Sequence, residues 1–254
     1  MVGDSTAEVI GRGLAAWGTD SGRLRVTALT SSGCATHSGT RLRVREGYEF
    51  APNGCPELFP SAARVAREEA VDAIVVFIGS SQLADWEYPG RSGWLSIPDA
   101  GVRQGYDGAL RAALATLDEA DVPILWADVP TPEWDLEVFG EMLGGPMPGS
   151  GDVVMNDPER AAILNGLDRR IIGAHPTAAL LPWAEHLAGP DGTISKDVRP
   201  DGLHVDEEKV DELAEAWLED LLDGAYDAVV ARAGGSLRPP EAHTWAAPGV
   251  SSPG

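Results

Sequence analysis

Short apolar runs alternate along the chain with longer segments of helical periodicity. Runs with the length and apolar content of strands lie at 24–28, 73–78, 123–127 and 177–181. The run Ala-Ile-Val-Val-Phe-Ile at 73–78 is apolar at every position, which is typical of a central parallel strand covered on both faces. This alternation predicts a parallel α/β protein.

Helical segments lie between these runs. Their apolar residues recur at three- and four-residue spacing over 8–17, 61–70, 102–120 and 158–174, and again in a last amphipathic stripe at 210–221. We therefore expect one folded domain over residues 1–232. Residues 233–254 have turn formers but no periodicity, which predicts a disordered tail.

Two further segments have an unusual composition. Residues 143–152, rich in Gly, Pro and Met, are expected to form a mobile loop near the mouth of a site. Met1-Val2-Gly3 leaves almost no strand before the first helix, although a strand needs about five residues. Either the chain is a fragment of a longer protein or its start was assigned too late.

Charge excludes several classes of partner. The 254 residues include 40 acidic and 19 basic side chains, a net charge of −21, which disfavours nucleic acids and anionic membrane surfaces. No Gly-x-Ser-x-Gly, phosphate-binding or dinucleotide-binding glycine pattern is present. The histidines outside the motifs below show no ligand spacing, so we expect neither a metal nor an organic cofactor; these are His37, His175, His186 and His243.

Gly3-Asp4-Ser5-Thr6 places a serine between a short strand and a helix expected to begin near Ala7. That position is the carboxyl edge of a parallel sheet, where open α/β proteins bind ligands. Helix N–H groups there favour the negative charge of an attacked ester carbonyl. Ser5 is therefore either a nucleophile or a simple helix cap.

A second motif, Arg-Pro-Asp-Gly-Leu-His at 199–204, precedes the last helix. Asp201 lies three residues before His204 across a Gly-Leu turn, so its carboxylate can orient the imidazole ring. A serine needs such a base to become a nucleophile at neutral pH. The alternative for His204 is a solvated histidine at a helix start.

Together, Gly-Asp-Ser near the amino terminus and Asp-Gly-Leu-His near the carboxyl terminus resemble the SGNH (GDSL-like) hydrolase superfamily. The resemblance implies a three-layer α/β/α sandwich with a flavodoxin-like sheet of about five parallel strands in the order 2-1-3-4-5. It also implies that Ser5 is the nucleophile, His204 the base and Asp201 its orienting carboxylate. The backbone N–H groups of Ser5 and Gly33 would form the oxyanion hole.

The oxyanion hole departs from the family pattern in one place. Most members carry an Asn two residues after the Gly that ends the third strand, whereas Gly79 is followed by Ser80, Ser81 and Gln82. We expect Ser81 or Gln82 to replace the missing donor. Loss of such a donor typically lowers the rate about 100- to 1000-fold.

The chain is more closely similar to the extracytoplasmic SGNH domains that follow acyltransferase-3 membrane domains in actinobacteria. The shared features are Ser-Gly-Cys at 32–34, a second Cys before the helix near Pro60, the stretch 84–90, Leu164-Asn165 and the 199–204 motif. The resemblance implies transfer of acyl groups to or from cell-envelope sugars, with a membrane acyltransferase domain as partner. It also implies an extracytoplasmic location if the chain is a fragment or has a late-assigned start, whereas a true start at Met1 predicts a cytoplasmic protein.

The two cysteines and three loop tryptophans leave alternatives open. Cys34 and Cys55 are either a disulfide or two free thiols, and we predict that they approach within bonding distance. Aromatic residues expected in loops after strands either stack on sugar rings or pack the loops; these are Trp86, Trp94 and Trp134.

We therefore expect a serine ester hydrolase or O-acyl (acetyl) transferase that acts on short acyl esters, including those of cell-envelope glycans, through a Ser-His-Asp site. The alternative is a catalytically degenerate SGNH module that binds acylated glycans. Retention of Ser5, Asp201 and His204 favours the enzyme, and the missing Asn favours the binding module.

Overall fold

The computed structural model describes residues 1–189, 193–235 and 237. The predicted tail at 233–254 lies outside these residues except for 233–235 and 237, and residue 233 ends a helix. Within the described residues, no helix is long and apolar enough to cross a membrane.

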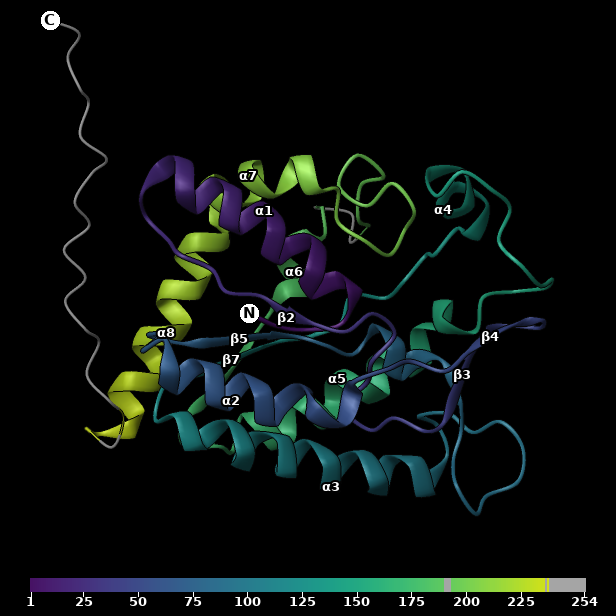
Figure 1. Ribbon diagram of the computed structural model, residues 1–254, viewed down its shortest axis with the longest axis horizontal. Helices are drawn as coiled ribbons and strands as arrows, with labels where there is room; N and C mark the ends of the chain where they lie inside the picture. The colour runs from purple at the N-terminus through teal and green to yellow at the C-terminus, as the bar shows by residue number, and fades with distance from the viewer. Residues whose placement is uncertain (190–192, 236, 238–254) are drawn as a thin grey trace, which may run out of the picture.

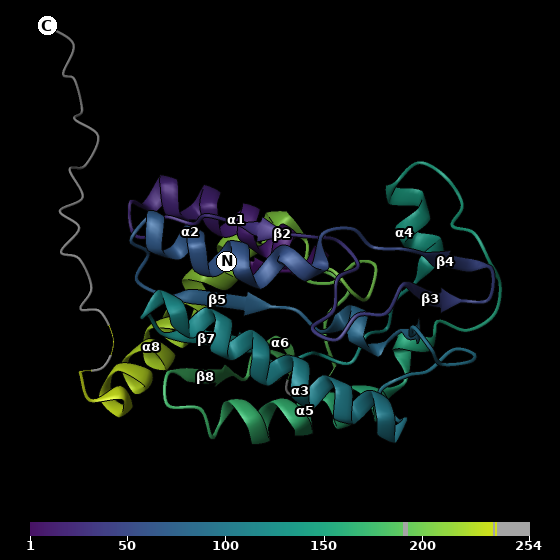
Figure 2. The ribbon, with the colours of Figure 1, turned by 60° about the horizontal axis from the view of Figure 1, so that its bottom comes forward.

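A five-stranded parallel sheet forms the centre of the molecule. Its strand order is β2-β1-β5-β7-β8, which is the predicted order 2-1-3-4-5 in chain sequence. Figure 2 shows β5, β7 and β8 side by side. The strands are β1 (Val2–Gly3), β2 (Leu29–Thr30), β5 (Ile74–Phe77), β7 (Ile124–Ala127) and β8 (Ala178–Leu181).

Helices cover both faces of this sheet, so the predicted α/β/α class is confirmed. Residues of β5 alternate between two cores: Ile74 and Val76 pack with one set of helices, and Val75 and Phe77 with the other. The first set is α2 (Leu58–Glu68), α3 (Ala100–Leu117) and α5 (Pro158–Ile172). The second set is α1 (Ser5–Ser21), α6 (Trp183–Leu187), α7 (Val210–Leu213), a π-helical turn (Ala214–Leu218) and α8 (Glu219–Ala233). In Figure 1, α1 and α7 lie above the sheet and α8 lies at its left side.

A second, antiparallel sheet was not predicted. It consists of β3 (Arg41–Arg45), β4 (Tyr48–Phe50) and β6 (Asp85–Glu87) in the order β4-β3-β6. In β3 the buried Leu42 and Val44 alternate with arginines, so only one face is apolar. Trp86 lies in β6 and is fully buried, which corrects its assignment to a loop.

Several boundaries differ from the sequence predictions. Residues 24–28 form no strand, and the observed strand is β2 instead. Helix α4 (Leu136–Met142) and helix α6 are additional. Residues 143–152 form turns, with a bridge between Glu46 and Ser150. Short 3-10 turns complete the elements: η1 (Cys55–Glu57), η2 (Ser80–Leu83), η3 (Asp118–Ala120), η4 (Val154–Asn156) and η5 (Glu207–Lys209).

Candidate active site

Ser5 begins α1 directly after β1, at the carboxyl edge of the parallel sheet. This turn requires glycine at position 3: φ of Gly3 is +157°, and a Cβ there would lie 1.8 Å from the carbonyl oxygen of Phe77. The helix starts two residues earlier than expected because Asp4 caps it, accepting the Thr6 N–H at 2.9 Å. Backbone contact between β1 and β5 therefore fixes the position of Ser5.

Asp4 also connects the Ser5 turn to the loop after β5. Its buried Oδ2 accepts hydrogen bonds from the Gly79 N–H at 3.3 Å and from the Ser80 hydroxyl at 2.6 Å. The sequence alone did not reveal this role of Asp4. An Asp directly before an apolar helical pattern is a cap signal, but its link to Gly79 depends on neighbouring strands 75 residues apart.

The structure brings the three residues of the predicted Ser-His-Asp site together. Ser5 Oγ lies 2.9 Å from His204 Nε2, and His204 Nδ1 lies 2.6 Å from Asp201 Oδ2. The His204 side chain is 14% exposed and that of Asp201 is 1% exposed. A single ring thus contacts a partly accessible hydroxyl on one side and a buried carboxylate on the other.

Asp201 is held in its ionised form although it is buried. Burial raises its pKa, but this effect is outweighed by the hydrogen bond and charge of His204 and by two backbone donors. Asp201 Oδ1 accepts the N–H groups of Leu203 and His204 at 2.8 and 2.7 Å. The net result is a pKa below the usual value for an aspartate, so the carboxylate stays negative beside the imidazole.

Arg199 and Gly202 shape the turn that carries His204. The buried Arg199 guanidinium donates to the carbonyl oxygens of Gly202 at 2.5 Å and Leu203 at 3.0 Å. Gly202 has φ of +76°, and a Cβ there would lie 2.0 Å from the carbonyl oxygen of Glu133. Burial lowers the pKa of Arg199 to about 10, so the side chain remains charged at neutral pH.

Two aromatic rings pack against the imidazole of His204. Phe139 stacks on it with centroids 5.5 Å apart, and Trp134 meets it edge-on at 6.1 Å. The Asn156 side chain fixes the backbone of Trp134: it accepts the backbone N–H at 2.8 Å and donates to the carbonyl oxygen at 3.1 Å. Packing of a loop is one of the two roles expected for Trp134. The contact of Phe139 with His204 was not predicted, because helix α4 was not predicted.

The expected oxyanion-hole residues lie in loops at the same edge of the sheet. Gly33 follows β2, and Ser31 N–H donates to the Gly3 carbonyl oxygen at 3.0 Å. Ser81 and Gln82 lie in η2 after β5, and both are buried. In the described part of the chain, neither side chain is hydrogen-bonded to Ser5 or His204.

The disulfide predicted between Cys34 and Cys55 is confirmed, with Cα atoms 5.3 Å apart. It connects the residue after Gly33 to η1 and thus to the start of α2. φ of Gly33 is +76°, and a Cβ there would lie 2.6 Å from the Phe50 ring. The loop that carries the Gly33 N–H is therefore closed covalently and packed against β4.

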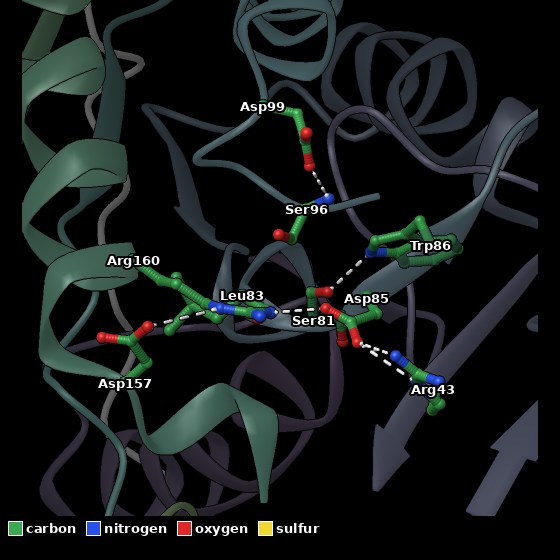
Figure 3. Close-up of polar contacts among 9 residues, drawn as sticks. All are labelled: Arg43, Ser81, Leu83, Asp85, Trp86, Ser96, Asp99, Asp157 and Arg160. Atoms are coloured by element: carbon green, nitrogen blue, oxygen red, sulfur yellow. Dashed lines mark hydrogen bonds and ion pairs between the residues drawn. The ribbon is translucent and has the colours of Figure 1, made fainter. Parts of the chain in front are cut away.

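Ion pairs and hydrogen bonds connect the η2 turn, the second sheet and α5 (Figure 3). Asp85 accepts Arg43 Nη2 at 2.5 Å and Arg160 Nη1 at 2.9 Å, and Arg160 also donates to the Leu83 carbonyl oxygen at 2.8 Å. Trp86 Nε1 donates to the Ser81 carbonyl oxygen at 2.9 Å. The contacts join β3, β6 and α5 around η2, so the backbone of both candidate donors is fixed.

Trp94 differs from the other two tryptophans. Trp94 is only partly buried. The guanidinium groups of Arg43 and Arg41 lie over its ring, at 4.9 and 5.8 Å from the ring centroid. Cation–π packing therefore accounts for its position.

Comparison with known proteins identifies related folds. No family model matches the sequence, and no curated protein matches it. A Bacteroides fragilis protein assigned as an acylhydrolase superposes with a TM-score of 0.54 at 9% identity, over 88% of this chain and 85% of that one. A GDSL-like lipase from Bacteroides thetaiotaomicron gives 0.49 at 10% identity, over 87% and 86%. An acetyl xylan esterase gives 0.49 at 11% identity, over 88% and 96%. The chain therefore shares the fold of the acylhydrolase.

Proposed function

We propose that this chain is a serine carboxylic ester hydrolase or acyltransferase of the SGNH type, with Ser5 as nucleophile. The observation that carries the proposal is the continuous contact from Ser5 Oγ through His204 to the buried Asp201, at 2.9 and 2.6 Å. The shared fold with an acylhydrolase is consistent with this chemistry.

The geometry supports a two-step acyl transfer. His204 Nε2 takes the Ser5 proton while Oγ attacks the ester carbonyl, and Asp201 stabilises the imidazolium that forms. The tetrahedral intermediate then expels its alcohol, which receives the proton from His204, and an acyl-Ser5 ester remains. In the second step His204 deprotonates water or an acceptor hydroxyl, which displaces the acyl group and restores Ser5.

Negative charge on the carbonyl oxygen requires donors in the first and second steps. Ser5 N–H at the start of α1 and Gly33 N–H in the disulfide-closed loop supply two of them in this proposal, helped by the helix dipole. Ser81 and Gln82 are the candidates for a third.

The proposed substrates are short acyl esters, including acetylated cell-envelope glycans, and the proposed partner is a membrane acyltransferase domain. These assignments follow from the resemblance to SGNH domains of acyltransferase-3 proteins. The Cys34–Cys55 disulfide supports an extracytoplasmic location, because such bonds persist in oxidising compartments.

The proposal is tested with p-nitrophenyl acetate and Ser5→Ala. We expect kcat/KM to fall at least about 1000-fold, because Ser5 Oγ is the hydroxyl that His204 Nε2 contacts. Ser21→Ala at the opposite end of the same helix is the control and should keep full activity. Equal hydrolysis by Ser5→Ala and the unmodified chain would show that the reaction occurs elsewhere.

The binding-module alternative gives a different result in the same assays. A degenerate module would hydrolyse no acyl ester and would not react with a serine-directed phosphonate, yet would retain acetylated oligosaccharides. Covalent labelling of Ser5 by the phosphonate, abolished in His204→Ala, is the outcome expected of the enzyme.

A further inference from the structure

Within the described residues, the His204 ring has one polar partner at each nitrogen, and the proposed reaction removes one of them. Ser5 Oγ lies 2.9 Å from Nε2, and Asp201 Oδ2 lies 2.6 Å from Nδ1. In the acyl-enzyme, Ser5 Oγ is esterified and has no proton to donate to Nε2. The ring must then keep its place, ready to deprotonate water or an acceptor hydroxyl, through Asp201 and through the contacts of its faces.

Phe139 supplies such a face contact. A single hydrogen bond at Nδ1 leaves the imidazole free to turn about the line that joins Nδ1 to the carboxylate oxygen. The Phe139 ring stacks on the imidazole at an angle of 25° between the two planes. Trp134 packs edge-on against both rings, with its centroid 5.3 Å from that of Phe139. Rotation of the imidazole would break the stacked contact, so Phe139 opposes it.

The chain that leads into α4 is attached to the turn that carries the imidazole. The Glu133 N–H donates to the Gly202 carbonyl oxygen at 2.9 Å, and the Asp135 N–H donates to the Asp201 carbonyl oxygen at 2.7 Å. The Asp135 side chain also caps α4, because its Oδ1 accepts two N–H groups of the first helical turn. These bonds fix the start of α4, and with it the Phe139 ring, relative to the catalytic turn.

The chain that leaves α4 is held by the second sheet. Arg45 of β3 donates to the carbonyl oxygens of Met147 and Pro148, both at 3.0 Å. The Ser150 N–H donates to the Glu46 carbonyl oxygen at 2.8 Å. In Figure 1 the chain leaving α4 runs to the tip of the β3–β4 hairpin. Helix α4 is therefore anchored at both ends, to the catalytic turn and to the hairpin.

We propose that Phe139 is a positioning residue for His204 that acts mainly in the second step, when acyl-Ser5 no longer contacts the imidazole. The inference rests on the proposed function. In the free chain, Ser5 and Asp201 hold the ring at both nitrogens, so loss of the Phe139 face changes acylation little. In the acyl-enzyme, the same loss lets the ring turn away from the attacking hydroxyl, and misplacement of a base lowers the rate steeply. Arg45 acts through α4, which it keeps against the ring.

Burst and steady-state hydrolysis of p-nitrophenyl acetate by the full chain separate the two steps. Phe139→Leu keeps an apolar side chain but removes the planar face. We expect the rate constant of the second step to fall at least about 10-fold, so that acyl-Ser5 accumulates and kcat and KM fall together. The ratio kcat/KM reports acylation and should stay within about 3-fold. Phe139→Tyr keeps the ring and should restore the second step.

Two results would overturn this role in a variant whose circular dichroism shows a folded chain. One is an unchanged second step in Phe139→Leu. The other is an equal loss of kcat and kcat/KM with KM unchanged, which is the result of general damage to the site. Failure of Phe139→Tyr to restore the second step would likewise show that the planar face is not what matters.

A second variant acts on α4 from a distance. Arg45→Met removes the donors to the chain after α4, so it should lower the second-step rate constant about 3-fold and add nothing in the Phe139→Leu background. Arg41→Met lies on the same strand but removes a pair with Glu49, and this control should keep kcat and KM. Additive effects of Arg45→Met and Phe139→Leu would contradict action through the Phe139 ring.

An NMR measurement separates this inference from the proposed function, because it needs no turnover. The His204 Nδ1 proton is donated to the ionised Asp201 and exchanges with water when the ring moves away. Ser5→Ala removes the partner of Nε2 and in this respect imitates the acyl-enzyme. Adding Phe139→Leu to Ser5→Ala should speed this exchange at least about 10-fold, whereas Phe139→Leu alone should change it little.

The exchange rates and the hydrolysis assay fail independently. Equal exchange in Ser5→Ala with and without Phe139→Leu would overturn the positioning role, even in a chain that hydrolyses esters through Ser5. Faster exchange in the double variant of a chain that hydrolyses no ester would overturn the proposed function and support the hold of Phe139 on the imidazole.

Discussion

Gln82 presents an unusual balance of hydrogen bonds. The side chain is fully buried, and its Oε1 accepts the His37 N–H at 3.0 Å. Its Nε2 makes no hydrogen bond of good geometry in the described structure, although Gln82 lies close enough to the Tyr88 hydroxyl to oppose the rise in pKa that burial causes there. Burying an amide donor without a partner costs about 1–3 kcal/mol. Ser81, its neighbour, is 6% exposed. Either side chain has an unassigned donor close to the loop that Asp4 ties to the Ser5 turn.

The side-chain donors of Ser81 and Gln82 can be tested by mutation. If one of them stabilises the oxyanion, Ser81→Ala or Gln82→Ala should lower kcat about 100-fold or more and leave KM nearly unchanged, because the bond forms mainly in the transition state. The measurement is steady-state hydrolysis of p-nitrophenyl acetate, with circular dichroism to verify folding. Full kcat in both variants would mean that the backbone N–H groups of Ser5 and Gly33 alone form the oxyanion hole.

Among the elements, those with a simple periodic pattern were predictable and those defined by tertiary contacts were not. The apolar run at 73–78 gave β5 (Ile74–Phe77) because both faces of that strand are buried. β3 has the alternation of a half-buried strand, but only Leu42 and Val44 carry it, and its partner β6 lies about forty residues further along the chain. Residues 24–28 failed as a strand because pairing needs a neighbour that β1 does not provide.

In the candidate site, too, residues in local motifs were predictable and residues brought in by tertiary contacts were not. Ser5, Asp201 and His204 were found because each lies in a short motif whose spacing limits its geometry. Phe139 was not found, since only the folded chain brings α4 beside the imidazole. Local spacing therefore identified the reacting groups, and the long-range contacts that hold them had to come from the structure.

A prediction for one element concerns the disulfide that closes the Gly33 loop. Cys34 and Cys55 are 21 residues apart, so the bond should stabilise the fold by about 3 kcal/mol in the chain-entropy view. Cys34→Ser with Cys55→Ser should lower the free energy of unfolding by about that amount in urea titration. Because Gly33 is adjacent, kcat should fall as well. Dithiothreitol should reproduce both effects in the unmodified chain and change nothing in the double variant.

Across the whole molecule, acidic side chains outnumber basic ones, and several aspartates are buried. The net charge is −21 at pH 7, so carboxylates repel one another in the folded state. Asp168 on α5 is fully buried between the two helices α3 and α5, where Tyr106 donates to its Oδ1 at 2.5 Å. Burial raises the pKa of Asp168 to about 7; the Tyr106 hydrogen bond opposes this, and the nearby Asp128 carboxylate adds to it.

A group whose folded pKa exceeds its unfolded value of about 3.9 binds its proton more tightly in the folded chain. Asp168 therefore contributes stability that is fully present below pH 4 and is lost as the pH rises to about 7, by up to about 1.4 kcal/mol per pH unit. Asp168→Asn should remove this dependence and be more stable than the unmodified chain above pH 7, because Asn accepts the Tyr106 hydrogen bond without ionising. Urea titrations at pH 5 and pH 8 measure both effects. The control is Asp107→Asn, which changes a partly exposed carboxylate paired with Arg111 and Arg170 and should show no gain at pH 8. An Asp168→Asn variant that is less stable than the unmodified chain at pH 8 would mean that the ionised carboxylate has a favourable partner in the folded state.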